Sequence, residues 1–206
     1  MMPKEEQANR TFTQNARRTQ IIQAAIETLA EIGYQKTSFN QISKRANLRS
    51  TGMISYHFSG KPELYSEVAA TVLAMAEETT GSRMEREETF RGRLRAYIEA
   101  NFEFLARYPA HTQALAQILM MECGRDLTRS QTLARSVLSV ERLSLLLEQG
   151  RSAGEFGAFD ALTMALAIRG ALDGVLRRYL KNVDLDLERC AAELTAAFDQ
   201  CTRPRQ

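Results

Sequence analysis

The sequence of 206 residues predicts an all-α fold of about nine helices. Apolar residues recur at the i, i+3, i+4 spacing of amphipathic helices, and no segment shows the alternation of a β-strand. Glycines and prolines fall between the periodic segments, where helices should end. We expect an N-terminal domain of three helices with a helix-turn-helix in residues 1–60, followed by a larger helical domain in residues 61–206.

The first expected helix runs from about Thr13 to Glu31, and Gly33 supplies its C-terminal stop. Glycine is suited to this position because it adopts the left-handed backbone at which many helices end. The apolar stripe of this helix consists of Ile21, Ile22, Ala25, Ile26, Leu29 and Ile32.

The second expected helix begins at Ser38, because Ser38 and Gln41 have the spacing of a capping box. It should end near Asn47, a residue that tolerates a left-handed turn. Its expected buried residues are Phe39, Ile42 and Ala46.

The third expected helix is short and can be capped by Ser50 or Thr51. Ile54 and Phe58 are assigned to the core, and Met53 is a further candidate to anchor this helix. A fourth helix should follow Gly60 and Pro62 and run to about Thr80, with a stripe of Leu64, Val68, Val72 and Met75.

The rest of the chain contains further helical stripes separated by breakers. One spans residues 90–105 and ends before Pro109, a shorter one spans 115–121, and a long one spans 133–147 and is closed by Gly150. Residues 152–160 form the clearest loop. Asp160 should cap the next helix, which continues to Tyr179, and the last helix should span residues 185–200.

Positive charge is concentrated at the N-terminal end of the chain. Residues 1–61 contain nine lysines and arginines and four glutamates, which gives a net charge of +5. Because the whole chain has a net charge of +2, the remaining residues have a net charge of −3. Such an excess over a helix-turn-helix is the electrostatic pattern of a DNA-binding domain.

Several residues of this N-terminal segment form a recognisable motif. They are Gly33, the pair Thr37 and Ser38, Ile42 with Ala46, Gly52, the triplet Tyr56, His57 and Phe58, and Lys61. In this pattern the segment resembles the tetracycline-repressor (TetR) family of bacterial transcription regulators. The turn between Ala46 and Gly52 is one residue longer than in common members, and Ser55 stands where a second aromatic residue is frequent.

The expected DNA-binding residues lie around the third helix. Hydroxyl, thioether, phenol, imidazole and cationic groups are suited to contacts with base edges and phosphates. Thr51, Met53 and Ser55 are expected at the bases, and Tyr56, His57 and Lys61 at the phosphates. Taken singly, Tyr56, His57 and Lys61 could instead be a packed ring, a surface imidazole and a solvated charge. The full set is Thr37, Ser38, Arg49, Ser50, Thr51, Gly52, Met53, Ser55, Tyr56, His57 and Lys61.

A homodimer is expected because one helix-turn-helix covers too little of a double-stranded DNA operator for tight specific binding. The last two helices would form the contact, with half-sites about 34 to 36 Å apart as inverted repeats. The spacing of Gly170 and Gly174 allows another helix to approach. The expected interface consists of Leu166, Arg169, Gly170, Asp173, Gly174, Arg177, Leu194 and Phe198.

The resemblance also implies a ligand cavity among helices four to eight, whose occupation releases a repressor from its operator. Methionine and aromatic residues favour a mostly apolar small-molecule effector. The candidate lining residues are Met75, Tyr97, Phe102, Met120, Met121, Leu147 and Asp173.

Other classes of protein fit the sequence less well. It contains two histidines, His57 and His111, and no GxSxG, HExxH, Walker or GxGxxG motif, so we expect no enzyme and no cofactor. The three cysteines lack the spacing of a metal site. No secretory signal or bilayer-spanning run is evident, so we expect a cytoplasmic protein without a membrane partner. An architectural or tethering DNA-binding protein without ligand control remains the alternative.

Overall fold

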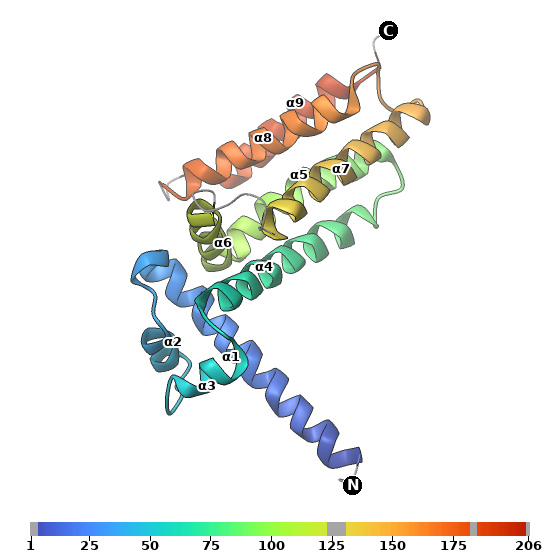
Figure 1. The fold of residues 1–206 in the computed structure, drawn as a ribbon. Helices are drawn as coiled ribbons and strands as arrows, with labels where there is room; N and C mark the ends of the chain where they lie inside the picture. Colours follow the sequence, from blue (N-terminus) through green and yellow to red (C-terminus); the bar gives the residue numbers. More distant parts are fainter. Residues whose placement is uncertain (1–3, 123–130, 182–184, 205–206) are drawn as a thin grey trace. The chain divides into compact units, whose positions relative to one another are not determined.

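The structure is a computed structural model that describes residues 4–122, 131–181 and 185–204, and the side chains of residues 14–121, 139–181 and 185–204. Over these residues it contains nine helices and no strand (Figure 1), which confirms the all-α prediction. The helices are α1 (Lys4–Lys36), α2 (Phe39–Arg45), α3 (Gly52–His57), α4 (Lys61–Met84), α5 (Phe90–Arg107), α6 (Pro109–Glu122), α7 (Gln131–Ser152), α8 (Ala161–Tyr179) and α9 (Leu187–Thr202).

The contacts within the chain define two compact units. Unit 1 comprises residues 1–72 and 110–130, and unit 2 comprises residues 73–109 and 131–206. Helix α4 contributes to both units, and α6 belongs to unit 1 although it follows α5 in the sequence. The domain boundary expected at residue 60 remains a prediction. None of the described helices combines the length and apolar character that crossing a lipid bilayer requires.

The ends of α1 and α2 follow the sequence signals. Gly33 has φ 78° and ψ 167°, which interrupts the helical geometry near the end of α1. The capping box at α2 is present: the Ser38 hydroxyl accepts a hydrogen bond from the Gln41 N–H at 3.4 Å, and Gln41 Oε1 accepts one from the Ser38 N–H at 2.7 Å. Asn47 has φ 50°, the left-handed turn that the sequence predicted after α2.

Other boundaries differ from the prediction. Helix α1 begins at Lys4, well before Thr13, and α4 continues past Gly81 to Met84. Glycine in a helix costs only about 1 kcal/mol, and the Glu85 N–H still bonds to the Gly81 carbonyl at 2.9 Å.

Two side-chain predictions in this region were wrong. Thr51 occupies the N-cap of α3 but makes no side-chain cap hydrogen bond, because its backbone is already helical at φ −66° and ψ −20°. Phe39 lies at the edge of unit 1 and is only half-buried.

The core of unit 1 joins α1, α2, α3 and the first half of α4. Tyr65 on α4 is buried, and its ring lies 4.9 Å from that of Tyr34 on α1. Burial raises the pKa of Tyr65 to about 12, so the phenol is neutral and its O–H bonds to the Thr37 carbonyl at 3.5 Å. The other large, fully buried side chains of unit 1 include one from α6, and they are Ile21, Ile26, Leu29, Ile42, Ile54, Phe58, Leu64 and Ile118.

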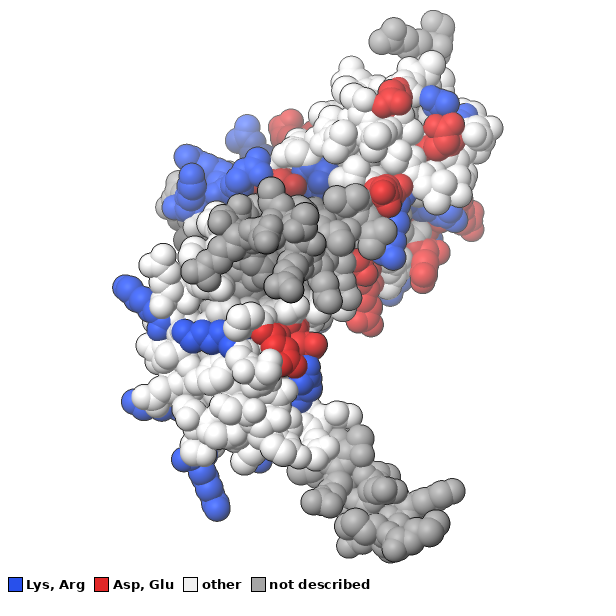
Figure 2. Space-filling view, in the orientation of Figure 1, with Lys and Arg blue, Asp and Glu red and all other residues white. Residues whose placement is uncertain are grey.

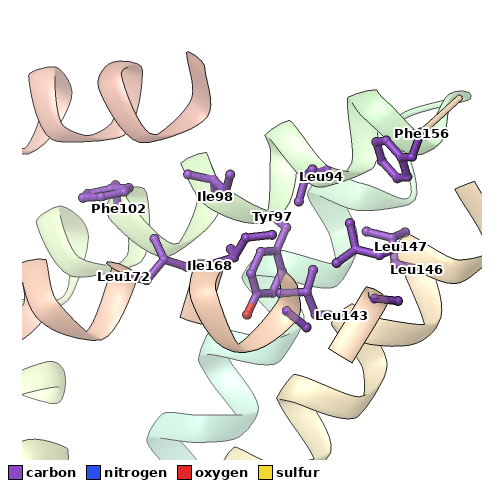
Figure 3. Close-up of a cluster of buried hydrophobic side chains, with 12 residues drawn as sticks. Leu94, Tyr97, Ile98, Phe102, Leu143, Leu146, Leu147, Phe156, Ile168 and Leu172 are labelled. Carbon is purple, nitrogen blue, oxygen red and sulfur yellow. The ribbon is translucent and has the colours of Figure 1, made fainter. Parts of the chain in front are cut away.

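The core of unit 2 lies between α5, α7, α8 and α9. Figure 3 shows Tyr97 of α5 among leucines of α7 and the buried face of α8. Gly150 near the end of α7 has a steric role: a Cβ there would lie 2.4 Å from the Phe156 ring, so only glycine lets that ring pack on the helix. Leu94, Ile98, Phe102, Leu143, Leu146, Leu147, Ala161, Ala165, Ile168 and Leu172 complete the cluster.

Candidate nucleic-acid interface

Helix α3 divides its side chains between the core and solvent. Ile54 and Phe58 are buried, as predicted, and hold the helix on α1. The opposite side exposes Ser55 together with 39% of Met53 and 70% of Tyr56. This side of α3 therefore presents a thioether, a phenol ring and a hydroxyl to solvent. Ser50, Thr51 and Gly52, at the start of α3, are also exposed.

The residues at the start of α2 are less available than expected. Thr37 is fully buried, and its hydroxyl donates to the Gly33 carbonyl at 2.8 Å. Ser38 is half-buried and its hydroxyl serves the capping box. A buried, satisfied hydroxyl cannot reach a phosphate, so we remove Thr37 from the set of DNA-binding side chains.

Lys61 at the start of α4 has a structural contact that the sequence did not indicate. Its ammonium donates to the Thr37 carbonyl at 2.6 Å, which links the start of α4 to the start of α2. The side chain is nevertheless exposed. Because an ammonium has three donors, this bond leaves others for a second acceptor.

Arg18 on α1 supports the end of α3, although sequence reasoning assigned it no role. It donates to the His57 carbonyl at 3.0 Å, and its guanidinium lies 4.4 Å from the centre of the Phe58 ring. It also pairs with Glu67 of α4 at 3.1 Å. The sequence shows the basic pair at positions 17 and 18, but it does not show that the Arg18 side chain contacts the end of α3.

The surroundings of His57 favour its neutral form. Partial burial lowers the pKa of its imidazole, and the charges of Arg18 and Arg17 lower it further. The ring stands edge-on to Tyr56 with centroids 5.1 Å apart. A neutral imidazole can still donate one hydrogen bond to a phosphate.

Two glutamines of α1 also contact the helix-turn-helix. Gln14 Nε2 donates to the Tyr56 phenol oxygen at 3.2 Å, and Gln20 Nε2 donates to the Ala46 carbonyl at the end of α2 at 2.7 Å. Helix α1 therefore fixes both helices of the motif. The sequence gave no signal for either contact, because both link residues distant along the chain.

The cations around the motif differ in availability. Arg45 is paired with Glu27 at 3.5 Å and with Glu31, so acidic residues of α1 neutralise it. Arg49 is exposed and forms no hydrogen bond or ion pair within the described part of the chain. Figure 2 shows Lys and Arg side chains projecting from the surface over α2 and the turn to α3. Among the described side chains of unit 1, the exposed cations are Lys36, Lys44, Arg45, Arg49 and Lys61.

The expected ligand residues lie in different surroundings within the two units. Tyr97, Phe102 and Leu147 fill the unit 2 core, and Met120 and Met121 belong to unit 1. Asp173 accepts two hydrogen bonds from the Arg169 guanidinium, at 2.8 and 3.1 Å. A helical stripe of aromatic and aliphatic residues can fill a core or line a cavity. Tyr97, Phe102 and Leu147 fill a core.

Unit 2 has a different hollow, an open groove of about 630 Å³ along α4 and the end of α5. Met75 is the one expected ligand residue that lines it. Arg83 crosses the groove to Glu99 at 3.1 Å and Glu103 at 2.6 Å. The remaining lining is mainly polar: Glu78, Thr79, Ser82, Arg86, Glu87, Arg107 and Tyr108.

The expected dimer residues occupy two environments. Leu166 is 56% exposed, and a Cβ at Gly170 would meet no atom within 4 Å. Leu194 and Phe198 instead pack against the unit 2 core, so most of their surface is already used within the chain. Arg169 donates to the Tyr97 hydroxyl at 3.2 Å and to Asn101 Oδ1 at 3.1 Å. Gly174 is half-buried and Arg177 is exposed.

Comparison with known proteins identifies the helix-turn-helix segment. Residues 21–68, which include α2, α3 and the start of α4, match the family model described as bacterial regulatory proteins, tetR family. The helix-turn-helix segment of this chain is therefore of the TetR-family type. The matched segment contains the outward side of α3 and the three residues that Arg18 contacts, His57, Phe58 and Glu67. Gln14 and Arg18 themselves lie before this segment.

Curated relatives match this chain over less than half of its length. The HTH-type transcriptional regulator BetI 1 of Chromohalobacter salexigens is 34% identical over 91 residues, 44% of this chain and 45% of the relative. BetI of Burkholderia cenocepacia is 35% identical over 88 residues, 42% of this chain and 45% of the relative. The matched region thus spans less than half of the length of these relatives.

Solved structures resemble the fold of this chain over nearly its whole length. A tetR-family regulatory protein from Rhodococcus RHA1 has a TM-score of 0.76 at 19% identity, covering 92% of this chain and 98% of that one. The fatty acid degradation regulator FadR from Bacillus halodurans has a TM-score of 0.72 at 23% identity, covering 92% and 97%. AibR, solved with isovaleryl coenzyme A and operator DNA, has a TM-score of 0.73 at 20% identity, covering 88% and 97%. At these identities the likeness concerns the fold.

Among the described residues, no group of three or more His, Cys, Asp or Glu side chains is placed to bind a metal ion. Cys190 is half-buried and Cys201 is exposed, and both are free thiols. Cys123 lies outside the described residues.

Proposed function

We propose that this chain is a DNA-binding transcriptional regulator whose α3 enters the major groove of an operator. The observation that carries the proposal is the outward side of α3, where Met53, Ser55 and Tyr56 stand exposed on a helix held from behind by Ile54 and Phe58. Hydroxyl and thioether groups suit base edges and thymine methyl groups, and the phenol suits a phosphate. We assign no catalytic activity and place the protein with the chromosome, in the cytoplasm.

The contacts are divided by position on the motif. Thr51, Met53 and Ser55 are assigned to base edges, and Gly52 lets the backbone approach the groove. Ser50, Tyr56, His57 and the cations Arg49 and Lys61 are assigned to phosphates, with Ser38 beside the start of α2. Arg45 is left out because its ion pairs with Glu27 and Glu31 hold it on α1.

Two copies of the chain are proposed to bind two inverted half-sites. The exposed side of α8 supports this, because Leu162 and Leu166 expose 50% and 56% of their surface and Gly170 leaves open space beside them. A second copy would bury these leucines across a two-fold axis. Leu194 and Phe198 would support the interface from beneath rather than form it.

Regulation is proposed to be repression relieved by a small molecule. Such an effector must bind the conformation without DNA more tightly than the DNA-bound one. The unit 2 groove is the candidate site, and its arginines, glutamates and hydroxyls fit a polar ligand better than the apolar one expected from sequence. AibR, with isovaleryl coenzyme A and operator DNA in its structure, is a fold neighbour in which both kinds of partner occur.

The decisive experiment is selection of bound duplexes from a random DNA library, followed by a search for the selected site in the genome. Enrichment of one inverted repeat, found upstream of few genes, supports a regulator. Many dispersed sites without a shared sequence would favour an architectural or tethering protein, which remains the second candidate because phosphate contacts alone give binding without specificity. No enrichment and no binding would refute both.

A further inference from the structure

We propose that Gln14 on α1 is a positioning residue for DNA binding, which turns the Tyr56 hydroxyl proton toward a phosphate. This inference rests on the proposed function, since it concerns the same surface of α3. Gln14 lies before the segment that the family model matches, which begins at residue 21. Its position follows from the long α1, which continues toward the N-terminus beyond its contacts with α3 (Figure 1).

The direction of the Gln14–Tyr56 hydrogen bond is the first step. The amide N–H₂ of Gln14 can only donate, and it lies 3.2 Å from the phenol oxygen. Tyr56 therefore accepts here, and its own O–H proton is available for another acceptor. No other hydrogen bond to the phenol is present within the described residues. A phosphate oxygen, which only accepts, is the matching partner in DNA.

The fixed orientation of the ring is the second step. Tyr56 is the most exposed of the large apolar and aromatic side chains described, at 70%. An exposed ring normally samples several rotamers, and fixing it costs conformational entropy. The His57 ring, 5.1 Å away at 85°, and the Gln14 amide both contact Tyr56 before any partner arrives. Holding the ring in advance lowers the entropy cost of binding.

The supporting contacts of α1 place Gln14 reliably beside α3. Arg18, one turn further along α1, bonds to the His57 carbonyl and lies over the Phe58 ring. Gln20 bonds to the Ala46 carbonyl. The register between α1 and α3 is thus fixed next to Gln14, so its amide meets Tyr56 as a consequence of packing.

The test measures the affinity of the full-length chain for a duplex carrying the library-selected site. Tyr56→Phe should lose about tenfold, the value of one hydrogen bond to a charged acceptor. Gln14→Ala should lose about threefold to tenfold in the wild-type background and nothing further in the Tyr56→Phe background. Gln14→Glu should lose more than Gln14→Ala, because a carboxylate would accept the phenol proton and add a negative charge.

Gln23→Ala is the matched control, because Gln23 is an exposed glutamine of the same helix that bonds only to Glu27, at 2.9 Å. It should bind as the wild type does. The melting temperatures of all variants should agree, which separates positioning from folding. Equal losses by Gln14→Ala in both backgrounds, or no loss at all, would overturn the inference while leaving DNA binding intact. A wild-type chain that binds no duplex would overturn the proposed function and this inference together.

Discussion

The guanidinium of Arg18 lies 4.4 Å from the centre of the Phe58 ring and bonds to the carbonyl of the residue before it. Phe58 follows α3 directly and is almost fully buried. One side chain of α1 therefore covers the end of α3 and satisfies its backbone. The orientation of the proposed recognition surface depends on this pair.

We predict that Arg18→Ala lowers the free energy of unfolding by about 2 kcal/mol, from the lost cation–π contact and the lost hydrogen bond. The ion pair with Glu67 adds little, because both partners are partly exposed. Urea unfolding measures the change. Arg17→Ala is the control, since Arg17 bonds to Gln20 on its own helix and not to α3. Equal stability of the two variants would contradict the role of Arg18.

Lys61→Ala should weaken binding to all duplexes alike and lower the slope of log affinity against log salt by about one. The salt titration also separates two roles of Lys61. If the ammonium serves only the Thr37 carbonyl, affinity would fall without any change of slope. Lys181→Ala, at an exposed lysine of unit 2, is the control and should change neither quantity.

The proposed dimer predicts different effects at two equally exposed leucines. Leu166→Glu on α8 should yield a monomer in light scattering, because a carboxylate would be buried against its counterpart. Leu145→Glu on α7 should remain dimeric, although Leu145 is 58% exposed. Gly170→Leu should also give a monomer, and the open space around Gly170 means that the single chain accommodates the new side chain. An intact dimer with Leu166→Glu and Gly170→Leu would place the interface elsewhere.

Thr195→Val should raise the free energy of unfolding by about 1 kcal/mol. A buried hydroxyl without a partner loses its hydrogen bonds to water and gains none in the protein. Thr195 Oγ1 on α9 is buried and finds no partner among the described residues. Thr202→Val should have the opposite effect, because that hydroxyl bonds to the Phe198 carbonyl at 2.7 Å. Thermal unfolding compares them. Destabilisation by Thr195→Val would indicate that the Thr195 hydroxyl has a hydrogen-bond partner after all.

Local features of the fold were predictable because their causes are local. The capping box of Ser38 and Gln41, the left-handed Asn47 and the cap at Asp160 each depend on residues within a few positions. The burial of Ile54 and Phe58 followed from helical periodicity. These features required no knowledge of how the helices pack.

Other features depend on packing that no single segment specifies. Thr37 is buried, and Lys61 and Tyr65 of α4, which lie far along the chain, both bond to its carbonyl. The start of α2 therefore could not be judged from its own residues. The expected ligand site stays a prediction for a related reason. Tyr97 and Leu147 have the spacing of a core and lie in the unit 2 core, and periodicity does not distinguish a core from a cavity wall.

The proposed function requires that the outward side of α3 reads base sequence. The direct measurement is to repeat the library selection with Thr51→Ala and with Ser55→Ala and to compare the preferred sites with that of the wild type. We predict relaxed preference at defined positions, placed symmetrically in the two half-sites, with preference elsewhere retained. An unchanged preference at every position would contradict the claim.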